Sequence, residues 1–301
     1  MSIIEIKNLT KKYSETSGCF GVNLAINHGE VFGFIGANGA GKSTVIKQLV
    51  GFIKPQQGSC RILEHDTWKE ASLVMNDLGY VGGEIALPSY LTGKQYLKMI
   101  ASIRKDVSWD YVEKLITYFE FNSKTKIKKM SKGMKQKVAL IAAFMHKPKV
   151  LILDEPTSGL DPLMQEKFNK IISNFKKDGT TIFMSSHIFG EIESNCDRIA
   201  IIKKGKIITE LVVGDLLNKD NKVYALAFDN NDNYQNILNA KFNVINSDHH
   251  NKLLKIMTTK ENHDEFIKEI NTYLPQKVEE IPFNLEEYFL QFYQEEVKFD
   301  D

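Results

Sequence analysis

A segment rich in glycine and ending in Lys-Ser-Thr is the clearest chemical feature of the sequence. From Gly36 to Ser43 it satisfies the pattern G-x-x-x-x-G-K-[ST], whose glycines let backbone N–H groups wrap around phosphates. We expect Lys42 to bridge the β- and γ-phosphates of a nucleotide and Ser43 to bind Mg²⁺. The expected nucleotide contacts are Gly36, Ala37, Asn38, Gly39, Ala40, Gly41, Lys42, Ser43 and Thr44. The alternative, a glycine-rich turn with a solvated lysine, is disfavoured because the loop joins an apolar strand to a helix.

Two acidic residues follow another apolar segment and supply the rest of the expected phosphate chemistry. Val150 to Leu153 reads as a buried strand and runs into Asp154 and Glu155. We expect Asp154 to hold Mg²⁺ through a water molecule and Glu155 to take a proton from the water that attacks the γ-phosphate. Taken alone, acidic pairs after strands are more often solvated strand ends or helix caps. Together with the glycine-rich loop, they favour a catalytic role.

These side chains require a parallel sheet whose strands end at one edge. Val31 to Ile35 is a nearly continuous apolar run before the glycine-rich loop, and Thr180 to Ser186 is another that ends on His187. Such runs are typical of strands buried on both faces. The sequence therefore predicts an α/β fold of the P-loop NTPase class, with its site at the carboxyl edge of the sheet.

The segments around these strands show other patterns of apolar and polar residues. Residues 3–8 and 20–26 alternate as half-buried antiparallel strands do, which predicts an antiparallel β subdomain. Between about 88 and 148 strand signals are missing and helix starts appear, which predicts a helical subdomain. The predicted N-caps of its helices are Thr92, Ser108 and Ser131.

The pattern of predicted strands and helices changes after residue 215. Strand and helix signals follow one another in the order β-α-β-β-α-β, and an amphipathic helix is expected around residues 285–293. This order predicts a small α+β domain, of ferredoxin-like type, over residues 216–301. The first domain would then span residues 1–215.

The composition describes a globular chain without an evident bulk partner. Of 301 residues, 43% are hydrophobic and 26% are charged, which excludes a disordered protein. Lysine and arginine total 39 against 38 acidic residues, so net charge gives no argument for a nucleic-acid partner. No apolar stretch approaches the roughly 18 to 20 residues of a membrane-spanning helix, and no secretory signal opens the chain. We therefore expect a cytoplasmic chain with reduced cysteines.

The motifs together resemble those of the nucleotide-binding subunit of an ABC transporter, over roughly residues 3–215. In this resemblance Tyr13 matches the aromatic residue that stacks on adenine, and His187 matches the switch histidine. Ser158-Gly159-Leu160-Asp161 resembles the D-loop. Ser131-Lys132-Gly133 resembles the signature motif, whose serine and second glycine contact the γ-phosphate of ATP bound to the other subunit. The resemblance therefore implies a dimer, of two copies or of this chain with a related ATPase, around two ATP molecules.

Two positions depart from the family pattern. The signature has Lys132 and Met134 where glycine and glutamine are commonest. At the Q-loop, Gly83 stands where a glutamine normally senses Mg²⁺ and the γ-phosphate. Glu84, next along, could substitute for that glutamine as a metal ligand or could face the partner subunit.

The resemblance is strongest to ATPases of the ABC-2 exporter group, which includes pumps for drugs, antibiotics and peptides. It implies separate membrane permease subunits and a peripheral position on the cytoplasmic side of the membrane. The alternatives are an importer ATPase, a soluble ABC ATPase of DNA repair and a non-catalytic nucleotide-dependent regulator. A lysine cluster surrounds the signature, but no aromatic residues are interleaved with it, so we expect no nucleic-acid partner.

Overall fold

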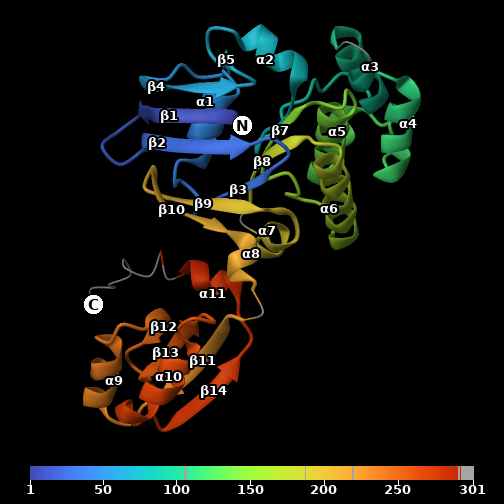
Figure 1. The fold of residues 1–301 in the computed structure, drawn as a ribbon. Helices are drawn as coiled ribbons and strands as arrows, with labels where there is room; N and C mark the ends of the chain where they lie inside the picture. The colour runs from blue at the N-terminus through green and yellow to red at the C-terminus, as the bar shows by residue number, and fades with distance from the viewer. Residues whose placement is uncertain (105–106, 187, 219, 291, 293–301) are drawn as a thin grey trace. The chain divides into compact units, whose positions relative to one another are not determined.

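The computed structural model describes all residues except 105–106, 187, 219, 291 and 293–301. The chain forms two compact units, Met1–Val212 and Val213–Asp301, which are described separately (Figure 1). No helix among the described residues is both long and apolar enough to cross a bilayer. The three cysteines are free and buried.

A six-stranded sheet forms the centre of the first unit. Its strands lie in the order β10 (Lys206–Val212), β9 (Arg198–Lys203), β3 (Val31–Ile35), β8 (Thr181–Ser185), β7 (Val150–Asp154) and β6 (Leu78–Val81). All neighbours are parallel except β10 and β9. Every residue of β3, β7 and β8 is buried, which confirms the three apolar strands predicted from the sequence.

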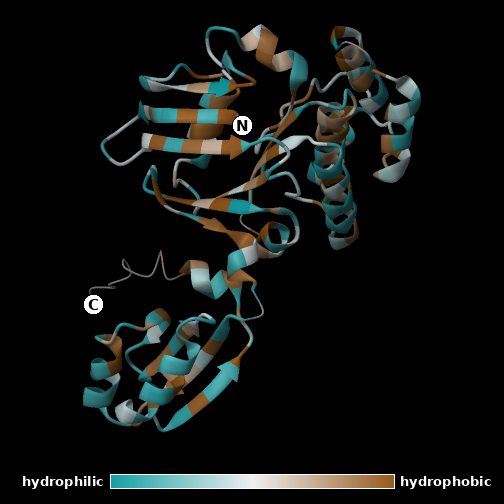
Figure 2. Cartoon of the chain, in the orientation of Figure 1, coloured by the Kyte–Doolittle hydropathy of each residue, from teal (hydrophilic) through white to brown (hydrophobic). Residues whose placement is uncertain are grey.

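A second, antiparallel sheet covers one side of this centre (Figure 1). Its strands are β2 (Gly18–Asn27), β1 (Ser2–Lys12), β4 (Gln57–Ile62) and β5 (His65–Asp66), in that order. Buried and exposed residues alternate along β2, and Figure 2 shows the matching alternation of hydropathy. The two sheets enclose helix α1 (Lys42–Leu49) in a single hydrophobic cluster. The antiparallel strands expected near residues 3–8 and 20–26 are confirmed and are longer than predicted, whereas β4 and β6 were not predicted.

Among the described residues, four helices and a 3₁₀ turn lie in the chain between β5 and β7, with the first helix before β6 and the others after it. They are α2 (Ala71–Asp77), α3 (Gly93–Ile103), α4 (Trp109–Tyr118), the 3₁₀ turn η1 (Ile127–Lys129) and α5 (Lys132–Phe144). Thr92 begins α3 with the predicted capping box: its Oγ1 accepts from Gln95 N at 3.2 Å, and Gln95 Oε1 accepts from Thr92 N at 2.8 Å. Ser108 occupies the N-cap of α4, but its hydroxyl makes no capping hydrogen bond, so that part of the prediction is wrong.

Two helices of the first unit follow the strands that carry the candidate site. Helix α6 (Pro162–Lys177) has Asp161 as its N-cap, whose Oδ1 accepts from Met164 N at 3.0 Å. The predicted N-cap followed by proline at the first helical position is confirmed. Helix α7 (Phe189–Asn195) follows β8 and packs against α6.

The second unit is an α+β fold with a four-stranded antiparallel sheet in the order β12, β13, β11, β14. Its elements are α8 (Val213–Leu216), β11 (Lys222–Ala227), α9 (Asn231–Leu238), β12 (Asn243–Asp248), β13 (Leu253–Thr258), α10 (His263–Glu269), η2 (Ile270–Tyr273), β14 (Lys277–Ile281) and α11 (Leu285–Leu290). This order of strands and helices is that of a split β-α-β unit of ferredoxin-like type. A core of tyrosine, phenylalanine and aliphatic side chains joins α9 and α10 to one face of the sheet.

Candidate functional site

The glycine-rich loop runs from the carboxyl end of β3 to the first residue of α1, so helix α1 directs its amino end at the loop. Gly41 caps the helix with a left-handed φ of 106°. A Cβ at Gly41 would lie 2.5 Å from the carbonyl oxygen of Gly18, so the close approach of β2 also excludes a side chain. The backbone N–H groups of a loop at a helix amino end, together with the helix dipole, suit it to bind phosphate anions.

Lys42 is held inside the loop. Its ammonium donates to the carbonyl oxygens of Gly36 at 2.6 Å and Ala37 at 3.3 Å. The residue is 5% exposed, and burial lowers the pKa of its ammonium below the ordinary lysine value. The charges of Glu155 and Asp154 oppose that shift in pKa. A cation with acidic residues nearby and a phosphate-binding backbone around it is suited to neutralise a terminal phosphate.

Three side chains meet where β3, β7 and β8 end. Ser43 Oγ donates to Asp154 Oδ2 at 3.1 Å, and Ser185 Oγ donates to Asp154 Oδ1 at 2.5 Å. Asp154 is 4% exposed, so these bonds satisfy a buried carboxylate. A hydroxyl beside a carboxylate fits Mg²⁺, which takes one or two protein oxygens and completes its shell with water and substrate phosphates. The donor set therefore suits a cation shared with a nucleotide.

Glu155 is set apart by its backbone. Its φ is 50°, a left-handed value that is uncommon outside glycine. Its N–H donates to Ser185, with 3.1 Å to Oγ and 3.2 Å to the carbonyl oxygen. Backbone strain of this kind is held in place by surrounding contacts and is found most often at functional sites.

The predicted signature region is joined to the loop that follows Glu155. Ser131 caps α5 by accepting from Met134 N at 3.3 Å. Lys132 Nζ donates to Ser158 Oγ at 2.7 Å. A Cβ at Gly133 would lie 2.5 Å from the carbonyl oxygen of Gly159, so only glycine allows this close docking. The predicted signature and D-loop are therefore in contact within one chain, and the D-loop Asp161 caps its own helix.

Tyr13 lies in the turn that joins β1 to β2. The residue is 56% exposed, and its N–H donates to Ser17 O at 2.9 Å. Gly18, at the start of β2, touches Gly41 of the phosphate loop, which brings the base of this hairpin against the loop. An exposed aromatic ring on that hairpin is suited to stack on a flat base.

At the Q-loop position the neighbour of Asp154 is Gly83. A Cβ there would lie 3.2 Å from Asp154 Oδ2. Glu84 is exposed, and no hydrogen bond or ion pair to it occurs among the described residues. His187, the predicted switch histidine, lies outside the described residues.

The comparison with known proteins bears on these motifs directly. The ABC transporter family model matches residues 19–158. Bacitracin transport ATP-binding protein BcrA of Enterococcus faecalis is 31% identical over 294 residues, which cover 95% of this chain and 95% of that protein. The chain belongs to the ABC transporter ATP-binding family. It is an ABC ATPase, and the resemblance, the fold class and the ATPase activity expected from the sequence are confirmed.

Further relatives and solved structures agree with this assignment. Lantibiotic transport ATP-binding protein SrtF of Streptococcus pyogenes is 37% identical over 210 residues, or 69% of this chain and 90% of that protein. A solved ATP-binding subunit of an ABC transporter superposes with a TM-score of 0.66 at 29% identity, covering 71% of this chain and 92% of that one. A dimeric bacterial ABC transporter cassette superposes with a TM-score of 0.63 at 25% identity, covering 70% of this chain and 98% of that one. ABC ATPases bind ATP and act as dimers with membrane permease partners.

Three buried polar residues of this ABC ATPase were missed from the sequence. Ser185 contacts both Asp154 and Glu155. Gln136, on α5, donates from Nε2 to Pro156 O at 2.5 Å, and Glu191 is buried on α7. The polar pair Ser185 and Ser186 at the end of an apolar strand was a signal that could have indicated Ser185. Gln136 and Glu191 have no such local signal.

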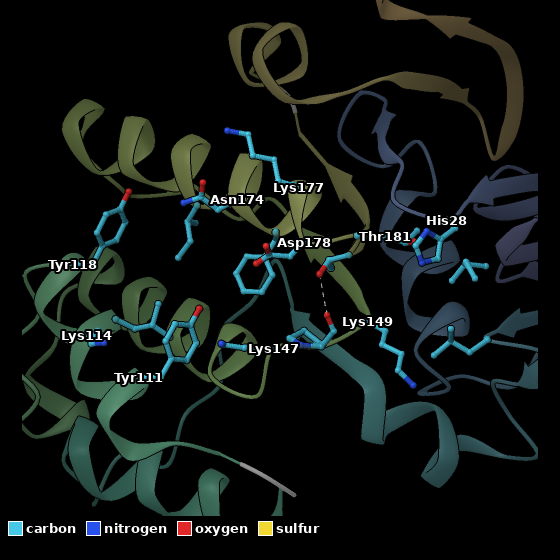
Figure 3. A pocket seen from close by; sticks show the side chains of 18 residues that line it. His28, Tyr111, Lys114, Tyr118, Lys147, Lys149, Asn174, Lys177, Asp178 and Thr181 are labelled. Carbon is cyan, nitrogen blue, oxygen red and sulfur yellow. Dashed lines mark hydrogen bonds between the residues drawn. The ribbon is translucent and has the colours of Figure 1, made fainter.

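A cavity of about 1090 Å³ lies at the amino ends of β7 and β8, at the edge of the central sheet opposite to the phosphate loop (Figure 3). Pro148 to Lys149 and Thr180 to Thr181, where β7 and β8 begin, line it. Lys147 Nζ lies there 4.9 Å from the centre of the Tyr111 ring. Because the phosphate loop follows the carboxyl end of a parallel strand, this cavity is separate from the ATP site.

Proposed function

We propose that this chain is the nucleotide-binding subunit of an ABC exporter and uses ATP to drive separate membrane permease subunits. The observation that carries the proposal is the pair of faces on one chain. One face has the phosphate loop with Lys42, Asp154 and Glu155. The other is the capped start of α5, which is docked on the loop after Glu155. In a dimer, the phosphate loop of each subunit would face the start of α5 of the other subunit. This arrangement would complete two ATP sites.

On the first face we assign binding roles to the phosphate loop, residues 36–44, and to Tyr13. Lys42 neutralises the β- and γ-phosphates, and Tyr13 stacks on the adenine. Ser43 and Asp154 would hold Mg²⁺, with Glu84 as a further candidate ligand. When bound, this cation would withdraw charge from the phosphates.

The chemical step is assigned to Glu155. Its carboxylate orients the attacking water and accepts its proton, while the Ser185 contacts fix its backbone. Lys42 stabilises the charge that develops on the transferred phosphate. We assign His187 to the γ-phosphate side of the same site.

Across the dimer, Ser131 and Gly133 would contact the γ-phosphate of ATP on the facing subunit. The hydroxyl and the N–H groups that open α5 form an anion site without a phosphate of their own. Asp161 would lie at the same interface. The dimer would join two copies of this chain or this chain and a related ATPase.

We infer the class of cargo from the relatives. Their names attribute bacitracin and lantibiotic transport to them, so we propose a drug, an antibiotic or a peptide as cargo. The permease would place the ATPase on the cytoplasmic side of the membrane. We assign the ATPase function to residues 1–215 and propose residues 216–301 as a smaller C-terminal domain, three residues beyond the division between the two compact units at Val212 and Val213.

The test is antibiotic resistance in a sensitive bacterium that expresses the chain with its permease. We expect increased resistance to a peptide antibiotic such as bacitracin, and complete loss of that increase with Lys42→Ala. Lys47→Ala is the matched control, because Lys47 is exposed on the same helix. Resistance that survives Lys42→Ala, or uptake in place of efflux of a labelled peptide, would contradict the exporter proposal.

A further inference from the structure

Glu191 is a buried carboxylate outside the residues assigned above. It lies in the first turn of α7 and is 3% exposed. Its Oε2 accepts from Ser186 Oγ at 2.7 Å, and its Oε1 accepts from Thr157 Oγ1. Burial of a carboxylate is costly unless it is hydrogen-bonded, and these two hydroxyls supply hydrogen bonds to both of its oxygens.

Both hydroxyls belong to segments that carry the chemistry. Thr157 is 2% exposed and lies two positions after Glu155, in the loop between β7 and α6. Ser186 is also 2% exposed and directly precedes His187 in the sequence. One carboxylate therefore ties the loop after Glu155 to the segment that follows β8.

The same loop also holds the start of α5. Its Ser158 accepts from Lys132, and its Pro156 carbonyl accepts from Gln136. A shift of Thr157 would therefore move two things together: the backbone that carries Glu155 and the helix end that would face the partner's ATP. The phosphate loop makes no hydrogen bond to this network among the described contacts.

We propose that Glu191 is a positioning residue for ATP hydrolysis, which acts through Thr157 and Ser186 to hold Glu155 and the start of α5 in register. This inference rests on the roles proposed above for Glu155 and the signature helix. Misplacement of a reacting group by about 1 Å lowers rates by about 100-fold. Loss of a hydroxyl that fixes the loop should therefore lower the rate of hydrolysis more than it weakens ATP binding.

The alternative is that Glu191 only stabilises the fold. A purely stabilising contact would lower the melting temperature and leave the kcat of the folded protein unchanged. A positioning contact would lower kcat and leave the KM for ATP nearly unchanged, because Lys42 and the phosphate loop are untouched.

The test compares full-length Glu191→Gln, Thr157→Val and Thr157→Ser by steady-state ATP hydrolysis and thermal unfolding. Thr157→Val removes the hydroxyl at nearly constant volume, and Thr157→Ser keeps it. We expect kcat to fall about 10- to 100-fold in Thr157→Val and Glu191→Gln, with KM within about threefold of wild type. Thr157→Ser is expected to retain kcat within about twofold. Glu193→Gln is the matched control, because Glu193 is exposed on the same helix.

Two outcomes would overturn the proposal: wild-type kcat in Thr157→Val and Glu191→Gln, or a kcat in Thr157→Ser as low as in Thr157→Val. If Glu191→Gln does not fold, the Thr157 pair decides alone. Wild-type protein without hydrolysis above Glu155→Gln would instead contradict the function proposed for the site.

If the wild-type protein shows no hydrolysis, hydrogen exchange of the backbone amides still tests whether Thr157 holds the loop in place. In the loop, Ser158 N donates to Glu155 O at 3.1 Å and Leu160 N donates to Thr157 O at 2.9 Å. We expect these amides to exchange faster in Thr157→Val than in Thr157→Ser, with no change in residues 36–41. Equal exchange in the two variants would overturn the inference.

Discussion

Ser43 and Asp154 are joined by a hydrogen bond of 3.1 Å between Oγ and Oδ2, although 111 residues separate them. The bond exists because β3 and β7 both border β8 and end at the same edge of the sheet. It brings two of the three predicted Mg²⁺-binding side chains into one place at the amino end of α1.

Replacement of Glu155 by glutamine is expected to trap a closed dimer. The amide cannot accept the proton of the attacking water, so ATP stays intact and continues to bridge the two subunits. Size-exclusion chromatography of Glu155→Gln with ATP and Mg²⁺ should show a dimer, and the same protein without ATP should elute later. A monomer under both conditions would contradict the sandwich arrangement.

Removal of the Ser185 hydroxyl is expected to slow hydrolysis. This hydroxyl donates to Asp154 and accepts from the N–H of Glu155, so Ser185→Ala leaves a buried carboxylate with one partner fewer. We expect a loss of about 1 to 2 kcal/mol in the free energy of unfolding and a fall in kcat of about 10-fold or more. Ser194→Ala, at an exposed site on α7, is the control. Unchanged kcat in Ser185→Ala would refute the prediction.

The Mg²⁺ requirement tests the proposal for Glu84. If its carboxylate helps to hold the cation, Glu84→Ala should raise the Mg²⁺ concentration for half-maximal hydrolysis by about tenfold, which corresponds to about 1.4 kcal/mol. Glu64→Ala, at another glutamate of the first unit, provides the comparison. An identical Mg²⁺ dependence in Glu84→Ala and wild type would exclude Glu84 as a ligand.

Acid should destabilise the first unit through His146. Burial lowers the pKa of this imidazole to about 4 from 6.5. The unfolded chain therefore binds a proton between pH 6.5 and 4 that the folded chain does not, so the stabilising effect is present above pH 6.5 and is lost as the pH falls through this range. From pH 7.5 to 5 we expect a loss of about 1 to 2 kcal/mol, since the side chain is only partly buried.

Denaturant unfolding of wild type and His146→Gln at both pH values checks this prediction. The glutamine amide retains a donor for the Leu78 carbonyl, which lies 3.2 Å from His146 Nε2. The variant should lose less free energy of unfolding than wild type over the same pH interval. Equal losses would show that His146 does not titrate on unfolding.

The elements closest to the chemistry were predictable because their signals are local. A glycine at a left-handed φ, an apolar strand before it and a helix after it all lie within about 20 residues, so the phosphate loop was evident from spacing alone. The capping box at Thr92 and the cap at Asp161 are local for the same reason. The strands β4 and β6 carry weaker alternation and depend on their neighbours for pairing, and they were missed.

The sequence by itself determined the family, the phosphate loop and the acidic pair at 154 and 155, because each is a short run of residue types with one strong physical meaning. Only the tertiary structure decided that Ser185 forms hydrogen bonds with both acidic residues. It also decided that Gly83, rather than Glu84, lies against Asp154. It also decided that Glu191 joins Thr157 to Ser186. These contacts link segments whose spacing follows no pattern along the chain, since they depend on which strand ends the folded sheet brings together.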